Sequence, residues 1–265
     1  MIEIKFYKDI NNSELEFLWN NLYQIVLEEN IISHPFLFNH YHWSKSWISN
    51  IKKDNQEFRC ILVKSDQDPI IIMPMLVERF ININFAELIG GKETDYQNIL
   101  INKFLYLKNK SEISTILKRI FYEKKIYYFR NKSINDDLTL LFLKDLFRFS
   151  FKFKYDESSY LRLKQSAENI PKKVRKQIIR LEKKNKIENK IINQENEEFN
   201  SVINDLIHTK NDHYISNKVK IMPNERINFY RDIASKNFAH LSYTKINNNY
   251  ASFHLGIKNR DSLIY

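Results

Sequence analysis

The residues most able to do acid–base chemistry in the first part of this chain follow a glycine pair. Gly90 and Gly91 end a segment rich in apolar residues, and Asp95 and Tyr96 come within the next five positions. A carboxylate there could take the proton of an attacking amine, and a phenol could return a proton to a leaving thiolate. A loop cap at Asp95 and a core position for Tyr96 explain the same two residues equally well, so both interpretations stay open.

A second candidate for proton transfer is His254. It lies in an alternating segment that predicts a strand over 250–258, and the alternation places it on the same side as Ser252 and Gly256. Imidazole titrates near neutral pH and can act as an acid or a base. A lone histidine on a strand is also common as a structural residue, and the sequence does not decide between the two.

Most of the net charge of the protein lies in one short segment. The chain carries a formal charge of +10, and residues 172–186 hold eight basic residues against the single acid Glu182. Apolar residues recur at helical spacing in this segment, so we expect a helix that packs by its apolar side and presents cations on the other. The apolar positions are Ile170, Val174, Ile178 and Leu181. The candidate phosphate-binding residues are Lys172, Lys173, Arg175, Lys176 and Arg180.

The ligand expected on these cations is a phosphate-bearing molecule such as a nucleotide-sugar, coenzyme A or a tRNA. A solvated basic helix without a ligand is the plain alternative. Charge alone does not choose among these partners.

Several other chemistries find little support in the residues. Three glycines in 265 residues nearly exclude a glycine-rich phosphate loop. The single cysteine, Cys60, lies in a strand-like segment and is expected to be a buried thiol rather than a nucleophile. His40 and His42 have no cysteine or carboxylate at metal-ligand spacing, so we expect no metal site.

Nothing in the sequence predicts export or insertion into a membrane. Residues 1–5 lack the basic and then apolar pattern of a signal peptide, and no stretch reaches the roughly 18 apolar residues that span a bilayer. We therefore expect a cytoplasmic protein.

The elements that must position these residues follow one order, and part of that order occurs twice. The first part predicts strands and helices at 3–7, 13–28, 41–48, 58–64, 69–80, 84–89, 98–101, 111–123, 125–129, 138–147 and 150–155. The second part predicts three helices and a hairpin at 171–186, 197–209, 224–235, 239–246 and 250–258. The predicted fold class is mixed α/β (α+β in arrangement), with two units at 1–160 and 161–265. Each unit is a mostly antiparallel sheet flanked by helices, and the second is expected to be truncated at its C-terminus.

Several short segments, together with this order, resemble acyltransferases of the GNAT superfamily in the tandem, FemAB-like arrangement. They are most similar to the acetyltransferase domain of CelD-type polysaccharide-biosynthesis proteins. The matching segments are 36–47, 70–75, 88–91 with 94–96, 170–183, 229–230 and the closing hairpin. The resemblance covers most of the chain, although each segment is only moderately specific.

The resemblance implies two GNAT-like units, with an acyl donor such as acetyl-coenzyme A on the C-terminal one. The implied reaction is acyl transfer to an amine or hydroxyl of a polysaccharide, a nucleotide-sugar or a cell-envelope precursor, and the implied anionic partner is a tRNA if the FemAB-like relation holds. In this family an amide-rich loop at a helix N-terminus binds the coenzyme pyrophosphate. This sequence lacks the Arg/Gln-x-x-Gly-x-Gly/Ala signature in both parts, and Glu93 at the matching turn opposes phosphate.

Two hypotheses of different classes therefore remain. The first is an acyltransferase, inactive if the donor site is incomplete. The second is a non-catalytic protein that uses the basic helix 171–186 to bind an anionic partner, RNA included. The sheet ending near residue 264 would also offer an exposed edge through which two copies of the chain could pair.

Overall fold

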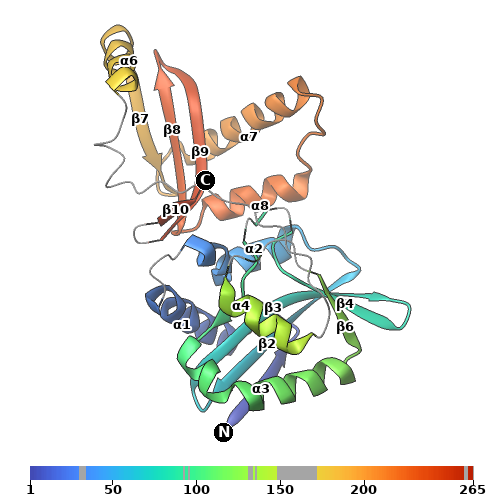
Figure 1. Cartoon of the computed structure of the whole chain (residues 1–265). Helices are drawn as coiled ribbons and strands as arrows, with labels where there is room; N and C mark the ends of the chain where they lie inside the picture. Colours follow the sequence, from blue (N-terminus) through green and yellow to red (C-terminus); the bar gives the residue numbers. More distant parts are fainter. Residues whose placement is uncertain are drawn as a thin grey trace.

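The chain forms a mixed α/β fold with two sheets, as the sequence predicts (Figure 1). The computed structural model describes residues 1–29, 34–91, 93–94, 96–130, 134, 136–147, 172–259 and 262–264. The described residues up to 147 are the first half, and those from 172 are the second half. The predicted boundary between residues 160 and 161 and the expected strand at 150–155 lie outside the described residues.

The first half contains one mixed sheet with strand order β1-β2-β3-β4-β6. Its elements are β1 (Ile2–Tyr7), α1 (Ser13–Glu29), the 3-10 helix η1 (His34–Asn39), α2 (Tyr41–Asn50), β2 (Gln56–Ser65), β3 (Asp68–Phe80), β4 (Ile83–Leu88), β5 (Leu100–Ile101), α3 (Lys103–Glu123), β6 (Ile126–Arg130) and α4 (Asp137–Leu146). Strands β1 to β4 are antiparallel neighbours, β6 joins β4 in parallel, and the short β5 pairs with β3.

Helices cover both faces of this first sheet. One core cluster packs α1 and α2 onto it through residues such as Trp19 and Trp47, and a second packs α3 and α4 onto it through residues such as Leu117 and Phe142. Because both faces are buried, β3 tolerates an uninterrupted apolar run, and its residues 70–73 are fully buried.

The second half contains an antiparallel sheet with strand order β10-β9-β8-β7. Its elements are α6 (Lys172–Lys184), β7 (Ile187–Ile192), α7 (Phe199–Ser216), α8 (Asn224–Ala234), β8 (Ala239–Ile246), β9 (Asn249–Asn259) and β10 (Ser262–Ile264). The predicted hairpin is present. Asn247 and Asn248 form its turn with φ of 51° and 69°, the backbone that a two-residue hairpin loop requires and that asparagine tolerates.

The order of elements in the second half repeats that of the first. A strand, two helices and three antiparallel strands run as β1-α1-α2-β2-β3-β4 in the first half and as β7-α7-α8-β8-β9-β10 in the second. The neighbours within each sheet are also the same, β1-β2-β3-β4 against β7-β8-β9-β10. Helix α6 stands before this repeated order.

The two halves share one core. The counterpart helices α2 and α8 pack against each other, and the rings of Trp43 and Phe229 meet edge to face with centroids 5.0 Å apart. Phe229, Ile233 and Phe238 belong to the same buried cluster as α1 and α2. The second half is therefore held against the first by apolar burial, which fixes any site that lies between them.

Candidate binding cavity between the two halves

A cavity of about 620 Å³ lies where the second half meets the first. Its walls are β9 from Tyr250 to Ile257, one side of α7 and α8, and three residues of the first half, Phe38, Trp43 and Glu93. Ligand sites for small molecules fall within about 300–1,000 Å³. The cavity is therefore large enough to bind a small organic molecule.

The corresponding place in the first half is filled by the chain itself. The described residues 93–94 and 96–101 contact η1 and α2 and end as β5, which pairs with β3. Trp43 Nε1 donates to Thr94 Oγ1 at 3.1 Å and Asn39 Nδ2 donates to the Asn98 carbonyl at 2.6 Å. In the second half, the counterpart elements α8 and β9 line the open cavity instead. Among the described residues, the space between the second helix and the middle strand of the repeated order is therefore filled in the first half and open in the second.

The turn that begins this filling segment depends on glycine. Gly90 has a φ of +130°, and a Cβ there would stand 2.1 Å from Thr94 Oγ1. Only glycine adopts that backbone without strain and leaves room for the Thr94 side chain. Thr94 in turn holds the indole of Trp43 at the cavity wall.

A partly buried ion pair crosses from one half to the other beside the cavity. Arg226 Nε of α8 lies 2.9 Å from Glu93 Oε1, and only 9% of the Glu93 side chain is exposed. Trp47 Nε1 of α2 donates to the other carboxylate oxygen at 3.4 Å. Glu93, which the sequence suggested would repel phosphate, is thus neutralised by Arg226 and fixes α8 against α2.

Tyr230 stands one turn after Arg226 on α8 and lines the cavity. Burial raises the pKa of its phenol, the Glu93 carboxylate adds to the rise, and Arg226 opposes it. The hydroxyl therefore keeps its proton at neutral pH. It can donate a hydrogen bond, or a proton, to a group bound in the cavity.

The polar residues on α7 give the cavity a positive rim. Lys210 and His213 line it together with Thr209. Because Arg226 and Glu93 offset each other, the Lys210 ammonium is the uncompensated formal charge among these lining residues. This charge favours a ligand with an anionic group.

His254, which the sequence suggested for proton transfer, is among the residues of β9 that line the cavity. Its contacts differ from those of Phe253 and Leu255, the apolar residues on either side of it. Phe253 and Leu255 pack into the core under α7. His254 pairs across the sheet with Ser242. It also lies close enough to His240 to add to the lowering of the His240 pKa, which burial and then Lys258 cause in the main. Strand alternation therefore places His254 on the opposite face, together with Ser252 and Gly256 as the sequence predicted.

The other predicted catalytic residues do not gather around the cavity. Tyr96 packs against the first core cluster, with its ring centroid 6.3 Å from that of Phe38, and it is not among the lining residues. Asp95 lies outside the described residues. The acid–base roles assigned to these two residues stay predictions.

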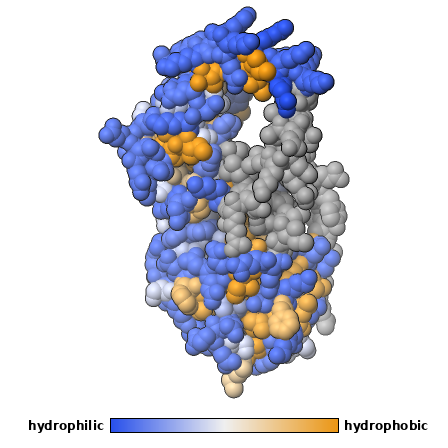
Figure 2. Space-filling model, turned by 90° about the vertical axis from the view of Figure 1, so that its left-hand side faces the viewer, coloured by the Kyte–Doolittle hydropathy of each residue, from blue (hydrophilic) through white to orange (hydrophobic). Residues whose placement is uncertain are grey.

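The predicted phosphate-binding residues are all exposed on α6 (Lys172, Lys173, Arg175, Lys176 and Arg180). None of them lines the cavity. The expectation that α6 packs by its apolar side is wrong, since Ile178 and Leu181 are 39% and 49% exposed. Figure 2 shows hydrophobic patches surrounded by hydrophilic residues at the end of the molecule where α6 lies.

Of the two histidines considered as metal ligands, His40 has a structural role at the start of α2. His40 Nδ1 accepts from the His42 amide at 3.2 Å and caps α2, and its ring lies 4.4 Å from that of Phe238. Burial lowers the pKa of His40 to about 4, so this imidazole is neutral. The described part of the chain contains no cluster of three or more His, Cys, Asp or Glu side chains that could hold a metal ion.

A coenzyme pyrophosphate does not fit the helix N-terminus of the first half. The first amides of α3 already have partners, because Asn102 Oδ1 accepts from the Leu105 amide at 3.0 Å and Glu29 Oε2 accepts from the Lys103 amide at 3.3 Å. A carboxylate at this position also repels phosphate. In the second half, no helix follows β10 among the described residues.

Residues that the sequence did not single out for chemistry are Tyr230 and Arg226. Their spacing of four on a helix was the only available signal, and it is equally typical of a surface pair. Their importance comes from Glu93, which is far away in the sequence and becomes their neighbour only when the halves pack.

Comparison with known proteins gives no family for this chain. It matches no protein-family model and no curated protein. One solved structure that matches part of this chain is described as a transcriptional regulator from Bacillus halodurans C-125. The match covers 60% of this chain and 99% of that one, at 10% sequence identity and a TM-score of 0.31. A similarity this low supports no functional argument.

Proposed function

We propose that this chain is an acyltransferase whose acceptor binds in the open cavity of the second half. The observation that carries the proposal is the contrast between the halves. Residues 93–94 and 96–101 occupy the space between α2 and β3, whereas the space between α8 and β9 is an open cavity. The GNAT-like resemblance of the sequence supports the choice of reaction. The repeated order of elements agrees with it.

The cavity residues suggest how an acceptor is held. Lys210 on the rim attracts an anionic group, such as the phosphate of a nucleotide-sugar or of a cell-envelope precursor, while Trp43 and Phe253 offer apolar surfaces to its remaining parts. Tyr230 donates from a phenol whose proton is retained. In acyl transfer, a hydrogen-bond donor such as this phenol stabilises the negative charge that develops on the carbonyl oxygen or on the leaving group.

The donor implied by the resemblance is an acyl thioester such as acetyl-coenzyme A. At the start of α3 the Lys103 and Leu105 amides are already bonded to Glu29 and Asn102, so they are not free to bind its pyrophosphate. The acid–base roles of Asp95, Tyr96 and His254 remain part of the proposal. A cytoplasmic location and pairing of copies through the β10 edge are further expectations that accompany it.

The proposal is tested by measuring thiol release from acetyl-coenzyme A in the presence of amino sugars and nucleotide-sugars. We expect turnover by the wild-type chain, and a loss of about 10²-fold or more in kcat for Tyr230→Phe, which removes only the hydroxyl. Tyr122→Phe is the matched control, because Tyr122 is 72% exposed on α3 and is not among the lining residues of the cavity. Absence of turnover by the wild-type chain with every acceptor would refute the acyltransferase.

A second candidate is a non-catalytic protein that binds an anionic ligand. It is favoured by the occupied amides at the start of α3 and by the exposed cations of α6. In that case a nucleotide-sugar binds, as seen by calorimetry, while no acyl group is transferred. Turnover that depends on Tyr230 excludes this candidate.

A further inference from the structure

Helix α6 presents cations and apolar side chains together at one end of the molecule. Over residues 172–186 the chain carries eight basic residues and one acid. Ile178, Ile179 and Leu181 on the same helix are 39%, 44% and 49% exposed. An apolar side chain that remains in water costs free energy that burial would recover. The surface is therefore suited to a partner that offers both negative charge and an apolar layer.

The helix is held in this position by the sheet rather than by its own apolar side. Asn247, in the turn between β8 and β9, accepts from the Lys186 amide at 2.9 Å through its side chain. The Asn247 amide donates to the Lys186 carbonyl at 2.8 Å, and its side-chain nitrogen donates to Asn185 Oδ1 at 2.8 Å. Figure 1 shows α6 at the end of the second sheet that points away from the first half.

We propose that α6 binds the surface of an anionic lipid bilayer. Cations near such a surface are attracted by its negative potential, and the apolar side chains of an amphipathic helix enter the boundary between headgroups and acyl chains. A nucleic acid would satisfy the cations alone and would leave Ile178 and Leu181 in water. A bilayer takes both kinds of side chain, and for that reason it is the partner the surface fits best.

The length of α6 sets its orientation on the bilayer. Its 13 residues extend about 20 Å at 1.5 Å per residue, less than the hydrocarbon core of about 30 Å. The helix therefore lies along the membrane surface. The described residues include no helix that is long and apolar enough to cross a bilayer. This inference does not depend on acyl transfer, since none of the residues of α6 lines the cavity.

The test is sedimentation of the full chain with lipid vesicles. Two kinds of vesicle are compared, one of phosphatidylcholine alone and one in which about one third of the lipid is phosphatidylglycerol. We expect binding to the second kind and little to the first. Raising the salt from about 0.1 M to about 0.5 M weakens the binding, because the attraction is screened.

Two variants separate the electrostatic part from the apolar part. Lys173→Glu combined with Lys176→Glu is expected to weaken binding by at least about tenfold, since each cation near an anionic surface strengthens binding severalfold. Ile178→Ser combined with Leu181→Ser, which keeps every charge, is expected to weaken it by on the order of tenfold. Both pairs are exposed, so the fold should be retained.

Matched controls lie on other helices. Lys108→Glu with Lys118→Glu reverses two exposed charges on α3, and Ile215→Ser removes an isoleucine that is 62% exposed on α7. Neither is expected to change vesicle binding by more than about twofold beyond the general effect of net charge.

Insertion of the apolar side is measured directly with a fluorescent label. Cys60 is the single cysteine and is fully buried, so Ile178→Cys can be labelled with a dye that responds to polarity. We expect its emission to shift to the blue on anionic vesicles, and the same dye at Ile215→Cys to show no shift.

The proposal is overturned by any of three results. The full chain does not sediment with anionic vesicles; or the Ile178 and Leu181 double variant binds them as tightly as the wild type; or the label at position 178 reports no change. Binding of RNA that is insensitive to the double serine variant, with no vesicle binding, would assign the surface to nucleic acid instead.

Discussion

The two halves of this protein follow the same order of elements but cover their sheets differently. In the first half, helices pack on both faces, and two separate core clusters enclose β2 and β3. In the second half one cluster lies between α7, α8 and one face of the sheet, and other buried residues, such as Phe229 and Ile233, belong to a cluster of the first half. The strands reflect this difference, because β3 is apolar at consecutive positions whereas β9 alternates, with His254 exposed between Phe253 and Leu255. The second half is thus the thinner layer and relies on the first for part of its burial.

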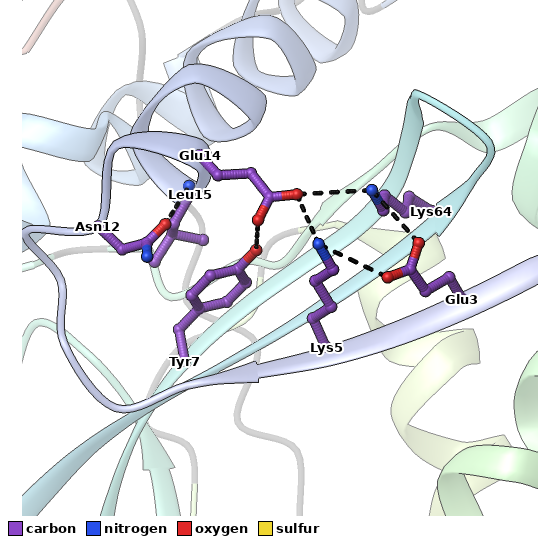
Figure 3. Close-up of polar contacts among 7 residues, drawn as sticks. All are labelled: Glu3, Lys5, Tyr7, Asn12, Glu14, Leu15 and Lys64. Atoms are coloured by element: carbon purple, nitrogen blue, oxygen red, sulfur yellow. Dashed lines mark hydrogen bonds and ion pairs between the residues drawn. The ribbon is translucent and has the colours of Figure 1, made fainter.

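Each half has a polar network that joins its first strand to its first helix. In the first half, Glu14 at the start of α1 accepts from Lys5 and Tyr7 at 2.7 Å each, and Lys64 lies between Glu14 and Glu3 (Figure 3). In the second half, Glu198 at the start of α7 pairs with Lys190 and accepts from Tyr243. Each half joins its first strand to its first helix through a lysine and a glutamate.

The tyrosine of this network comes from a different strand in each half. Tyr7 lies at the end of β1 itself, whereas Tyr243 lies on the neighbouring strand β8 and also donates to Glu188 at 3.0 Å. The order of elements is therefore retained while the residues that fill each position differ. The space between the second helix and the middle strand also differs, because a chain segment fills it in the first half and a cavity occupies it in the second.

The substitution with the largest expected effect weakens the apolar contact through which the second half depends on the first. Phe229 on α8 is fully buried against Trp43, and Phe229→Ala should lower the free energy of unfolding by about 3–5 kcal/mol. All three tryptophans lie in the first half. Denaturation followed by tryptophan fluorescence reports on that half, and far-ultraviolet circular dichroism reports on both.

For the wild type we expect the two signals to change together, and for Phe229→Ala we expect helix content to be lost first. The control is Phe142→Ala, a fully buried residue between α3 and α4, which should cost a similar amount while the two transitions stay coincident. Coincident transitions in Phe229→Ala would show that the halves do not depend on this contact.

A smaller effect tests the ion pair that joins the halves. Glu93→Gln keeps the size of the side chain but leaves the partly buried guanidinium of Arg226 without its charge partner. We expect a loss of about 1–3 kcal/mol in the free energy of unfolding. The additional loss from Arg226→Met should be smaller in the Glu93→Gln background than in the wild type, as measured by a double-mutant cycle.

The surface pair between Arg59 and Glu57 is the matched control within one half. The Glu57 side chain is 65% exposed, so Glu57→Gln is expected to cost less than about 1 kcal/mol. Equal costs at the two glutamates would mean that the contact between the halves adds nothing to an ordinary surface pair.

The sequence predicted the order of elements well where the signal was local. The hairpin of β8 and β9 and the buried Cys60 follow the prediction, although the turn has two residues, Asn247 and Asn248, rather than the predicted three. Helix α3 begins at Lys103, earlier than the predicted 111, because Asn102 caps it. Strand β7 was not predicted. It lies at an edge of the sheet and most of its residues are exposed, so it lacks the alternation that marks a half-buried strand.

The candidate site was less predictable because its parts are distant in the sequence. The cavity needs α8 and β9 from the second half and Glu93 from the first, and no local pattern shows that they meet. The sequence could identify residues with suitable chemistry, such as His254 and Tyr96. It could not show that Tyr96 packs into a core cluster or which face of the sheet would face the cavity. The exposure of Ile178 and Leu181 had the same cause, since a helical pattern predicts an apolar side but not its partner.

The smallest expected effect compares the two polar networks by their response to acid. Hydrogen bonds from Lys5 and then Tyr7 hold the pKa of Glu14 at about 2, below its usual value of 4.5. A lowered carboxyl pKa stabilises the fold above pH 4.5, and this contribution is lost as the pH falls towards 2. Because 42% of the Glu14 side chain is exposed, Glu14→Gln should cost no more than about 1 kcal/mol at pH 7 and should flatten the loss of stability between these pH values. Lys190 also lowers the pKa of Glu198, and Tyr243 and Lys245 add to this effect. Because Glu198 accepts from Tyr243 at 3.2 Å whereas Glu14 accepts from Tyr7 at 2.7 Å, Glu198→Gln should show the same change to a smaller degree. Urea unfolding at several pH values measures both, and a larger acid response from Glu198 would reverse the ranking of the two networks.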